Sequence, residues 1–284
     1  MNTHASDFSQ VIGRVESRKA VIGRERAEWL AATLDLDEIP GDGTTLPAGW
    51  HWLWFNPFVK RSGIGADGHP KRGGFLPDVG LPRRMWAGGR ITYHVPLPFG
   101  ADAEKTSTIK NVVEKVGKAG RLVFVTVQHG IKAGGVLHIE EEQDIVYREA
   151  ATPGAKAPAP QAAPDDAQWE REIVPDPVLL FRYSALTSNG HRIHYDLPYA
   201  RDEENYPDLV VHGPLTATLL QAFACEIRPD ARLKHFSFRG MSPLFVSASF
   251  HLKARAGAEP DRLELWAAGP GNGLAMQAEA QFHV

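Results

Sequence analysis

Apolar residues recur at four-residue spacing in one segment of the C-terminal half, and this pattern predicts a buried helix over residues 215–227. The positions on its apolar face are Leu215, Leu219, Phe223 and Ile227. Pro214 suits a first helical position, with Gly213 just before it, and Pro229 prevents continuation at the other end. Both ends of the helix are therefore marked in the sequence.

Alternating apolar and polar positions follow this helix and predict a run of antiparallel strands. They occur at residues 233–238, 244–252, 263–265 and 274–282. A further strand is expected at residues 178–183, ahead of the helix. One long helix followed by about four strands is typical of a sheet wrapped around a single central helix.

The N-terminal half shows a similar but weaker plan. A helix is expected at residues 26–34, a short apolar segment at 49–55, and strands near 91–97, 121–131 and 136–147. Residues 63–89 form a glycine- and proline-rich stretch far longer than the usual connection of about 4–6 residues, and such loops are often functional. We expect this stretch to line a site.

Prolines and alanines crowd together after residue 149, where no large apolar residue appears until the chain resumes its pattern. We interpret residues 150–168 as a linker between an N-terminal module, 1–149, and a C-terminal module, 169–284. Since single cores rarely grow much beyond roughly 250 residues, a chain of 284 residues can form two cores of ordinary size.

Composition narrows the class of protein. Apolar residues make up 43% and charged residues 23% of the chain, a globular balance, and a net charge of −3 gives no general attraction for nucleic acid or an anionic membrane. The first residues lack a basic segment followed by an apolar one, so a cytoplasmic protein is expected. The single cysteine, Cys225, excludes an internal disulfide and a thiolate metal cluster.

Polar side chains that can handle protons are dense in residues 183–200, which read YSALTSNGHRIHYDLPYA. Asn189 and His194 could converge on one water if the chain turns at Asn189-Gly190 and becomes helical near Arg192. Two alternatives remain open at this point. The segment could be a solvated loop, or His191 and His194 could be metal ligands, although no third ligand of suitable spacing is evident.

This segment resembles the signature of the MaoC-like, or hydratase 2, branch of the hot-dog superfamily. The residues in register with it are Leu186, Thr187, Ser188, Asn189, His191, Arg192, Ile193, His194, Asp196 and Ala200. Residues 210–220 resemble the start of the family's central helix. Together with residues 73–91, the segment looks most like the double hot-dog dehydratases, which include itaconyl-CoA and mesaconyl-CoA hydratases and mitochondrial 3-hydroxyacyl thioester dehydratases. The resemblance implies an α+β double hot-dog fold, each module a sheet around a central helix.

The resemblance also implies roles for individual residues. His194 matches the catalytic histidine, which would act as general acid and base, and Gly213 matches the glycine whose backbone N–H receives the thioester oxygen. Asn189 stands where the family has its catalytic aspartate, so it could orient the water but could not accept a proton. His191 is expected to supplement it. The chemistry requires neither a cofactor nor a metal.

A CoA or acyl-carrier-protein thioester should need basic groups around an apolar slot. Candidates are Arg83, Arg84 and Arg90, with Trp86 and Phe75 as walls, although these arginines could equally be a solvated loop. A homodimer is compatible with the fold.

We expect reversible hydration of a short, branched dicarboxylic enoyl-CoA, in which itaconyl-CoA or mesaconyl-CoA gives citramalyl-CoA. One alternative is a dehydratase of longer 3-hydroxyacyl thioesters, on CoA or an acyl carrier protein. Another is a module that binds acyl thioesters without catalysis.

Overall fold

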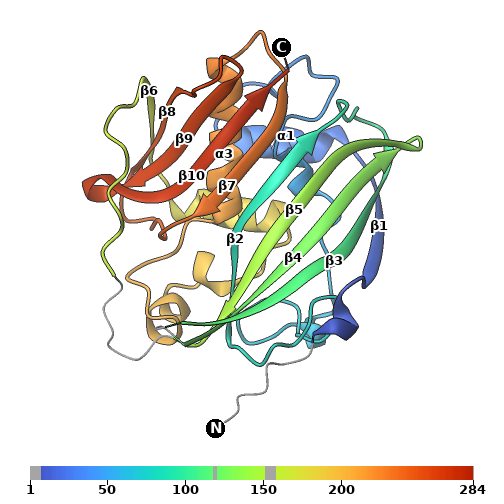
Figure 1. Cartoon of the computed structure of the whole chain (residues 1–284), viewed down its shortest axis with the longest axis vertical. Helices are drawn as coiled ribbons and strands as arrows, with labels where there is room; N and C mark the ends of the chain where they lie inside the picture. The colour runs from blue at the N-terminus through green and yellow to red at the C-terminus, as the bar shows by residue number, and fades with distance from the viewer. Residues whose placement is uncertain (1–7, 118–119, 151–157, 284) are drawn as a thin grey trace.

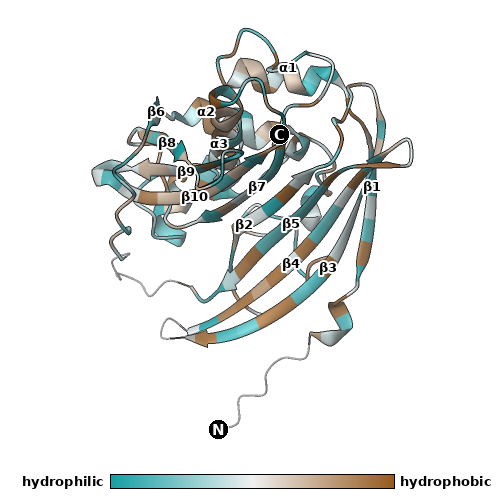
Figure 2. Cartoon of the chain, turned by 45° about the horizontal axis from the view of Figure 1, so that its top comes forward, coloured by the Kyte–Doolittle hydropathy of each residue, from teal (hydrophilic) through white to brown (hydrophobic). Residues whose placement is uncertain are grey.

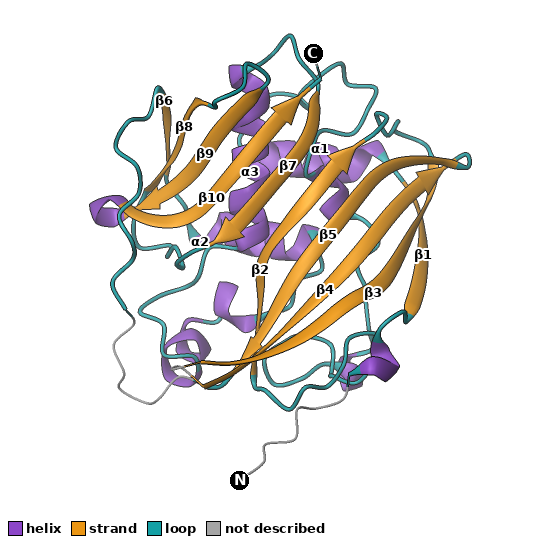
Figure 3. Ribbon diagram, in the orientation of Figure 1, coloured by secondary structure: helices purple, strands orange, loops and turns teal. Residues whose placement is uncertain are grey.

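The computed structural model describes residues 8–117, 120–150 and 158–283. Within these residues, ten strands form one continuous antiparallel sheet, and three α-helices lie against one of its faces (Figure 1, Figure 3). Apolar and polar residues alternate along β3 and β4 (Figure 2), as expected for strands whose two faces differ in burial.

The sheet order shows that the chain consists of two halves with the same plan. The order is β1-β3-β4-β5-β2-β7-β10-β9-β8-β6, so the first five strands form one half and the last five repeat their arrangement in reverse. The strands are β1 (Val15–Val21), β2 (Arg83–Tyr93), β3 (Asp102–Gly117), β4 (Gly120–Ala133), β5 (Val136–Arg148), β6 (Trp169–Ile173), β7 (Leu233–Gly240), β8 (Phe250–Ala256), β9 (Arg262–Gly269) and β10 (Gly273–Phe282). The pairing of β2 with β7 joins the halves.

Helix α3 (Gly213–Ile227) packs against β7, β8, β9 and β10 and fills the C-terminal half. Its sequence is apolar on most sides because most of its residues are buried, and each fully buried leucine stabilises the fold by roughly 1.5–3 kcal/mol. The predicted helix is confirmed to within two residues, with His212 rather than Gly213 as its N-cap. In the N-terminal half, the described residues between α1 (Arg24–Thr33) and β2 contain no α-helix, only the short 3-10 helices η2 (Trp50–Leu53) and η3 (Arg61–Gly63).

The segment expected to be a strand at residues 178–183 is wrong, because it lies in helix α2 (Pro177–Leu186). Asp176 is the N-cap, and its side chain accepts a hydrogen bond of 2.8 Å from the Leu179 N–H. Pro177 occupies the first turn, where its missing N–H has no cost. An aspartate followed by a proline is a helix-start signal, and the continuous apolar run behind it obscured the helical period.

Other expectations were met in part. Helix α1 (Arg24–Thr33), β4 and β5 confirm the segments expected at 26–34, 121–131 and 136–147. The strand expected at 244–252 begins only at Phe250, and β2 lies earlier than the strand expected at 91–97. The sixteen-residue strand β3 was missed, as were β1 and β6. The remaining short helices are η1 (Ser9–Val11), η3 (Arg61–Gly63), η4 (Arg192–His194), η5 (Tyr199–Glu203) and η6 (Pro270–Asn272).

Part of the predicted linker, residues 151–157, lies outside the described residues. The rest of it runs along the C-terminal half of the sheet: the Ala163 N–H donates to the Asn272 carbonyl at 2.8 Å, and the Leu274 N–H donates to the Gln161 carbonyl at 2.7 Å. The module bounds stay predictions. Among the described residues, no helix is both long and apolar enough to cross a lipid bilayer.

Candidate active site

A tight turn connects α2 to the segment that carries the candidate chemistry. Ser188 adopts a left-handed conformation with a φ of 52°, and the Asn189 N–H donates to the Ser184 carbonyl at 2.8 Å. The Asn189 side-chain oxygen then accepts the His191 N–H at 3.0 Å, an Asx turn that reverses the chain. The predicted turn at Asn189-Gly190 and the helical residues from Arg192, in η4, are both observed.

His194 ends η4 and is buried, with 7% of its surface exposed. Its Nδ1 lies 2.7 Å from the Val210 carbonyl oxygen. Because a carbonyl can only accept, Nδ1 carries the hydrogen and Nε2 keeps a free lone pair. Burial lowers the pKa of His194 to about 4, so the ring is neutral near pH 7. A neutral imidazole with a free Nε2 is suited to accept a proton.

A second buried histidine supports the first. The ring of His212 stacks on that of His194, with centroids 3.6 Å apart and planes 18° from parallel. Its Nε2 lies 2.8 Å from the Ser184 hydroxyl oxygen, and the Nδ1 has no hydrogen-bond partner among the described residues. Burial lowers the pKa of His212 well below its ordinary value. The stack therefore pairs two neutral rings and fixes the plane of His194.

Gly213 follows His212 and is the first residue of α3. A Cβ built on Gly213 would meet nothing within 4 Å, so open space adjoins its backbone. The N–H groups of a helix's first turn have no partner within the helix and carry partial positive charge. The Gly213 N–H can therefore donate to an oxygen that becomes negatively charged. Gly213 directly follows His212, whose ring stacks on that of His194.

A loop of the N-terminal half reaches this segment. The His69 ring lies 4.2 Å from the His191 ring, and the His191 ring lies 5.6 Å from that of His194, edge to face. His69 is itself held by Asp67, whose carboxylate is 3.3 Å from its Nδ1. Burial lowers the pKa of His191 to about 2. Three histidines from the two halves thus lie close together.

The contact between the two loops is unusually close at two glycines. A Cβ built on Gly68, which has a φ of +89°, would lie 1.8 Å from the Gly190 carbonyl oxygen. The Arg192 N–H donates to the Asp67 carbonyl at 3.0 Å, and the Arg192 guanidinium donates to the Ala66 carbonyl and pairs with Asp196 at 2.7 Å. Arg192 and Asp196 therefore brace the loop of one half against η4 of the other.

The predicted binding residues are dispersed. Arg84 donates a hydrogen bond to Tyr147. Burial has the largest effect on the pKa values of His69 and His191, and the positive charge of Arg84 lowers both further, so Arg84 lies near these two rings. Arg83 forms an ion pair of 3.0 Å with Glu204.

The other three lie elsewhere. Trp86 packs on Trp52 and Phe238, and Phe75 packs against a separate apolar cluster between β3, β4 and β5. Arg90 pairs with Glu142 and Asp144. Only Arg84 thus has contacts that place it near the histidines.

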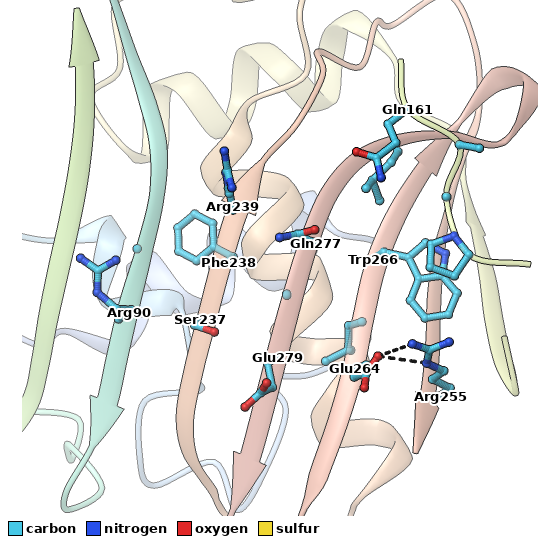
Figure 4. Close-up of a pocket in the computed structure, with 17 residues that line it drawn as sticks. Arg90, Gln161, Ser237, Phe238, Arg239, Arg255, Glu264, Trp266, Gln277 and Glu279 are labelled. Atoms are coloured by element: carbon cyan, nitrogen blue, oxygen red, sulfur yellow. Dashed lines mark hydrogen bonds and ion pairs between the residues drawn. The ribbon is translucent and has the colours of Figure 1, made fainter. Parts of the chain in front are cut away.

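Two cavities of the described residues lie away from His194. The larger, about 720 Å³, lies on the face of the sheet opposite the helices, where Arg90, Gln277 and Glu279 line it (Figure 4). The smaller, about 500 Å³, lies at the edge strand β1 and is lined in part by Ser188, which precedes Asn189. Neither cavity is lined by His194 or by any other histidine. Of the two, only the smaller adjoins the turn at Asn189.

Sequence reasoning missed four residues of this arrangement: Asp67, His69, Ser184 and His212. His212 and Ser184 belong to segments that were singled out, but only the fold shows that they touch. Asp67 and His69 lie in the long loop that we expected to line a site. In the described part of the chain, no group of three or more histidine, cysteine, aspartate or glutamate side chains is arranged to hold a metal ion.

Residues 49–246 match the family model described as hydroxyacyl-thioester dehydratase type 2. The chain is 46% identical to the mesaconyl-C(4)-CoA hydratase of Chloroflexus aurantiacus, over 98% of this chain and 99% of the relative. Among solved structures, a MaoC-like dehydratase from Phytophthora capsici superposes with a TM-score of 0.70 at 14% identity, over 98% of this chain and 99% of the other.

A Mycobacterium tuberculosis protein described as having a double hotdog fold superposes with a TM-score of 0.54 at 12% identity, over 96% of each chain. With the palindromic strand order, this similarity confirms the α+β double hot-dog fold.

Proposed function

The chain belongs to the hydroxyacyl-thioester dehydratase type 2 family, and we propose that it adds water reversibly to the double bond of a short dicarboxylic enoyl-CoA, with His194 as the acid–base residue. It is a hydro-lyase of the MaoC-like type. The observation that carries the assignment to His194 is the hydrogen bond from its Nδ1 to Val210, because it leaves Nε2 as a neutral proton acceptor. The ring also stacks on His212, the residue just before the start of α3.

In the hydration direction, His194 Nε2 takes a proton from water while the water oxygen bonds to C3 of the acyl group. The C2–C3 π electrons move toward the thioester carbonyl and leave an enolate oxygen. The His194 imidazolium then returns its proton to C2, so one molecule of water has been added and the ring is neutral again. Positioned general acid–base catalysis of this kind contributes roughly 10²–10⁴-fold to a rate.

The enolate oxygen needs hydrogen-bond donors, and the Gly213 N–H at the start of α3 is our candidate. A single donor aimed at such an oxygen typically stabilises the transition state by about 3–4 kcal/mol. The open space beside Gly213 supports this role, since a thioester can approach the backbone there without displacing a side chain. Asn189 orients the water through its side-chain NH2, because its oxygen is engaged by the His191 N–H.

The proposed substrate is mesaconyl-CoA, whose double bond is conjugated with the thioester and which is hydrated to citramalyl-CoA. The isomeric itaconyl-CoA gives the same product by this mechanism after its double bond has moved to C2–C3. The relative from Chloroflexus aurantiacus, 46% identical along its whole length, supports a dicarboxylic acyl group. Arg84 is the residue we assign to the free carboxylate, because it is the one predicted arginine whose charge reaches His69 and His191. Guanidinium groups bind carboxylates with two parallel hydrogen bonds.

The test is a spectrophotometric assay of hydration on mesaconyl-CoA, itaconyl-CoA and crotonyl-CoA, which lacks the carboxylate. We expect Arg84→Gln to lower kcat/KM for the dicarboxylic substrates about 10–100-fold, the equivalent of one charged hydrogen-bond pair, and to leave crotonyl-CoA within about threefold. Arg90→Gln is the matched control, since Arg90 is paired with two acids on the opposite face of the sheet. Equal losses on all substrates would reject the carboxylate assignment.

The family description favours one second candidate, a dehydratase of longer 3-hydroxyacyl thioesters. Turnover of crotonyl-CoA and longer enoyl-CoAs well above that of the dicarboxylic substrates would support it. Tight binding of every thioester without turnover would instead indicate a module that binds acyl thioesters of CoA or of an acyl carrier protein without catalysis.

A further inference from the structure

Asn189 leaves the site without the carboxylate that the hydratase 2 signature has at this position. An amide cannot act as a proton acceptor, and the oxygen of Asn189 is already engaged by the His191 N–H at 3.0 Å. The water that attacks C3 has two hydrogens, of which His194 Nε2 can accept one. A second acceptor on the other hydrogen would fix the orientation of that water.

Asp67 and His69 form a carboxylate–imidazole pair beside this position. Asp67 Oδ2 lies 3.3 Å from His69 Nδ1, and Asp67 Oδ1 accepts the His69 N–H at 3.0 Å, so the side chain is held at two points. Because a carboxylate can only accept, it places the ring hydrogen on Nδ1 and leaves Nε2 as an acceptor. This is the tautomer that His194 has through Val210.

The pair is brought to the site by the loop of the N-terminal half, not by the half that holds His194. The His69 ring lies 4.2 Å from the His191 ring, which is 5.6 Å from that of His194, and Asp67 accepts the Arg192 N–H through its backbone carbonyl. Burial lowers the pKa of His69, and the hydrogen bond that His69 donates to Asp67 opposes this effect only in part, so the ring is neutral near pH 7.

We propose that His69, fixed by Asp67, holds the attacking water together with His194 and so replaces the carboxylate that Asn189 lacks. The inference rests on the proposed function. The water gives one proton to His194 Nε2 and keeps the other, which is hydrogen-bonded to His69 Nε2 and stays on the new hydroxyl group. His69 therefore exchanges no proton with the substrate, and the proton that reaches C2 still comes from His194. With both hydrogens held, the oxygen lone pair is directed at C3.

Asp67→Asn is the decisive variant. Asparagine can keep the turn, because its side-chain oxygen still accepts the His69 N–H. Its NH2 group, however, donates to Nδ1, which moves the ring hydrogen to Nε2 and turns the acceptor into a donor. We expect kcat/KM to fall about 10–100-fold, the loss typical when the hydrogen-bond partner of a metal-binding histidine is removed. Thermal stability should be unchanged.

Two variants of His69 separate chemistry from structure. His69→Phe keeps a ring without an acceptor, so the water is no longer positioned and kcat/KM should fall about 100-fold. His69→Gln restores an acceptor near the Nε2 position and should recover at least tenfold of that loss. Glu170→Gln is the matched control, because Glu170 pairs with His251 at 2.8 Å on the exposed edge of the sheet, and it should change nothing.

The acid limb of the pH profile gives a readout that a structural role would not move. The groups that face His69 are Asp67 and Arg72 on its own loop, Arg84 on β2 and His191 before η4. If His194 and His69 must both be neutral, log kcat/KM should fall with a slope approaching 2 in the wild type and 1 in His69→Gln.

Activity of Asp67→Asn and His69→Phe within about threefold of Glu170→Gln would overturn the inference while the hydratase function stands. A wild-type chain that hydrates no enoyl-CoA would instead refute the proposed function. If His69→Phe does not fold, Asp67→Asn and His69→Gln decide the question.

Discussion

Gly68 offers a direct test of whether the loop of the N-terminal half sets the geometry of the turn at Asn189 and Gly190. A Cβ at this position would lie 1.8 Å from the Gly190 carbonyl oxygen, whereas real Cβ atoms essentially never approach closer than 3.0 Å. Gly68→Ala must therefore push the two loops apart by about 1.2 Å. Gly190 lies between Asn189, which we propose orients the water, and His191, so the displacement acts on both residues.

The two effects of the substitution can be estimated separately. An alanine with a positive φ costs about 1–2 kcal/mol in the left-handed region, and overpacking adds about 1–3 kcal/mol. A displacement of about 1 Å at a catalytic group lowers rates by about 100-fold. We expect Gly68→Ala to unfold at a temperature lower by several degrees and to lose about 10–100-fold in kcat, with a smaller change in KM.

The matched control is Gly73→Ala in the same loop. Gly73 has a φ of +87°, yet a Cβ there would meet nothing within 4 Å, so this variant has the same backbone cost without the clash. Thermal unfolding and enoyl-CoA hydration would be measured on both variants at a temperature where both are folded. Equal kcat values for the two would show that the contact between the loops does not govern catalysis, and our account of the site would be wrong.

Two further results are expected. Ser184→Ala removes the hydroxyl 2.8 Å from His212 Nε2 and leaves a buried ring without that partner, so urea unfolding should show a loss of about 1–3 kcal/mol, and a loss no larger than in Ser242→Ala would contradict this. Burial lowers the pKa of His194 to about 4, below the unfolded value of about 6.5, so its contribution to stability is complete above pH 6.5 and is lost as the pH falls toward 4. Urea unfolding at pH 7 and pH 4.5 should therefore differ by about 2–3 kcal/mol from this residue alone, and the difference should shrink in His194→Gln.

Local signals account for the parts of the fold that the sequence predicted. Helix α3 is marked by Pro214, Pro229 and an apolar face, all of which lie between residues 214 and 229. Strand β3 escaped because its inward-facing positions include Lys105 and Ser107, so the apolar half of the alternation is interrupted. Helix α2 was mistaken for a strand because apolar residues run together behind its N-cap. Periodicity thus fails where the interior itself is polar or where a helix is buried on several sides.

The residues of the candidate site likewise fall into those that local sequence signals predict and those that only the fold brings together. Asn189, His191 and His194 are close in sequence, and their spacing with a turn signal was enough to place them in one loop. The predicted helix start places His212 just before α3, but only the fold shows that its ring stacks on that of His194. Asp67 and His69 lie more than a hundred residues before His191, and no pattern in the sequence specifies that contact. It depends on the pairing of β2 with β7, which joins the halves.

The two halves have the same strand order but different interiors, and this difference explains how they divide the chemistry. The C-terminal half is filled by α3, whose first residues can receive a developing negative charge, and it holds His194 between Val210 and His212. In the N-terminal half no long helix lies directly before β2 as α3 lies before β7: between η2 and β2 the described residues contain only the three-residue helix η3, and the interior holds a buried pair, His51 and Glu141, 3.1 Å apart. The chain between η2 and β2 forms the long loop that carries Asp67 and His69. Because one half supplies the helix terminus and the other supplies this loop, neither half contains the complete set of groups that the proposed reaction requires.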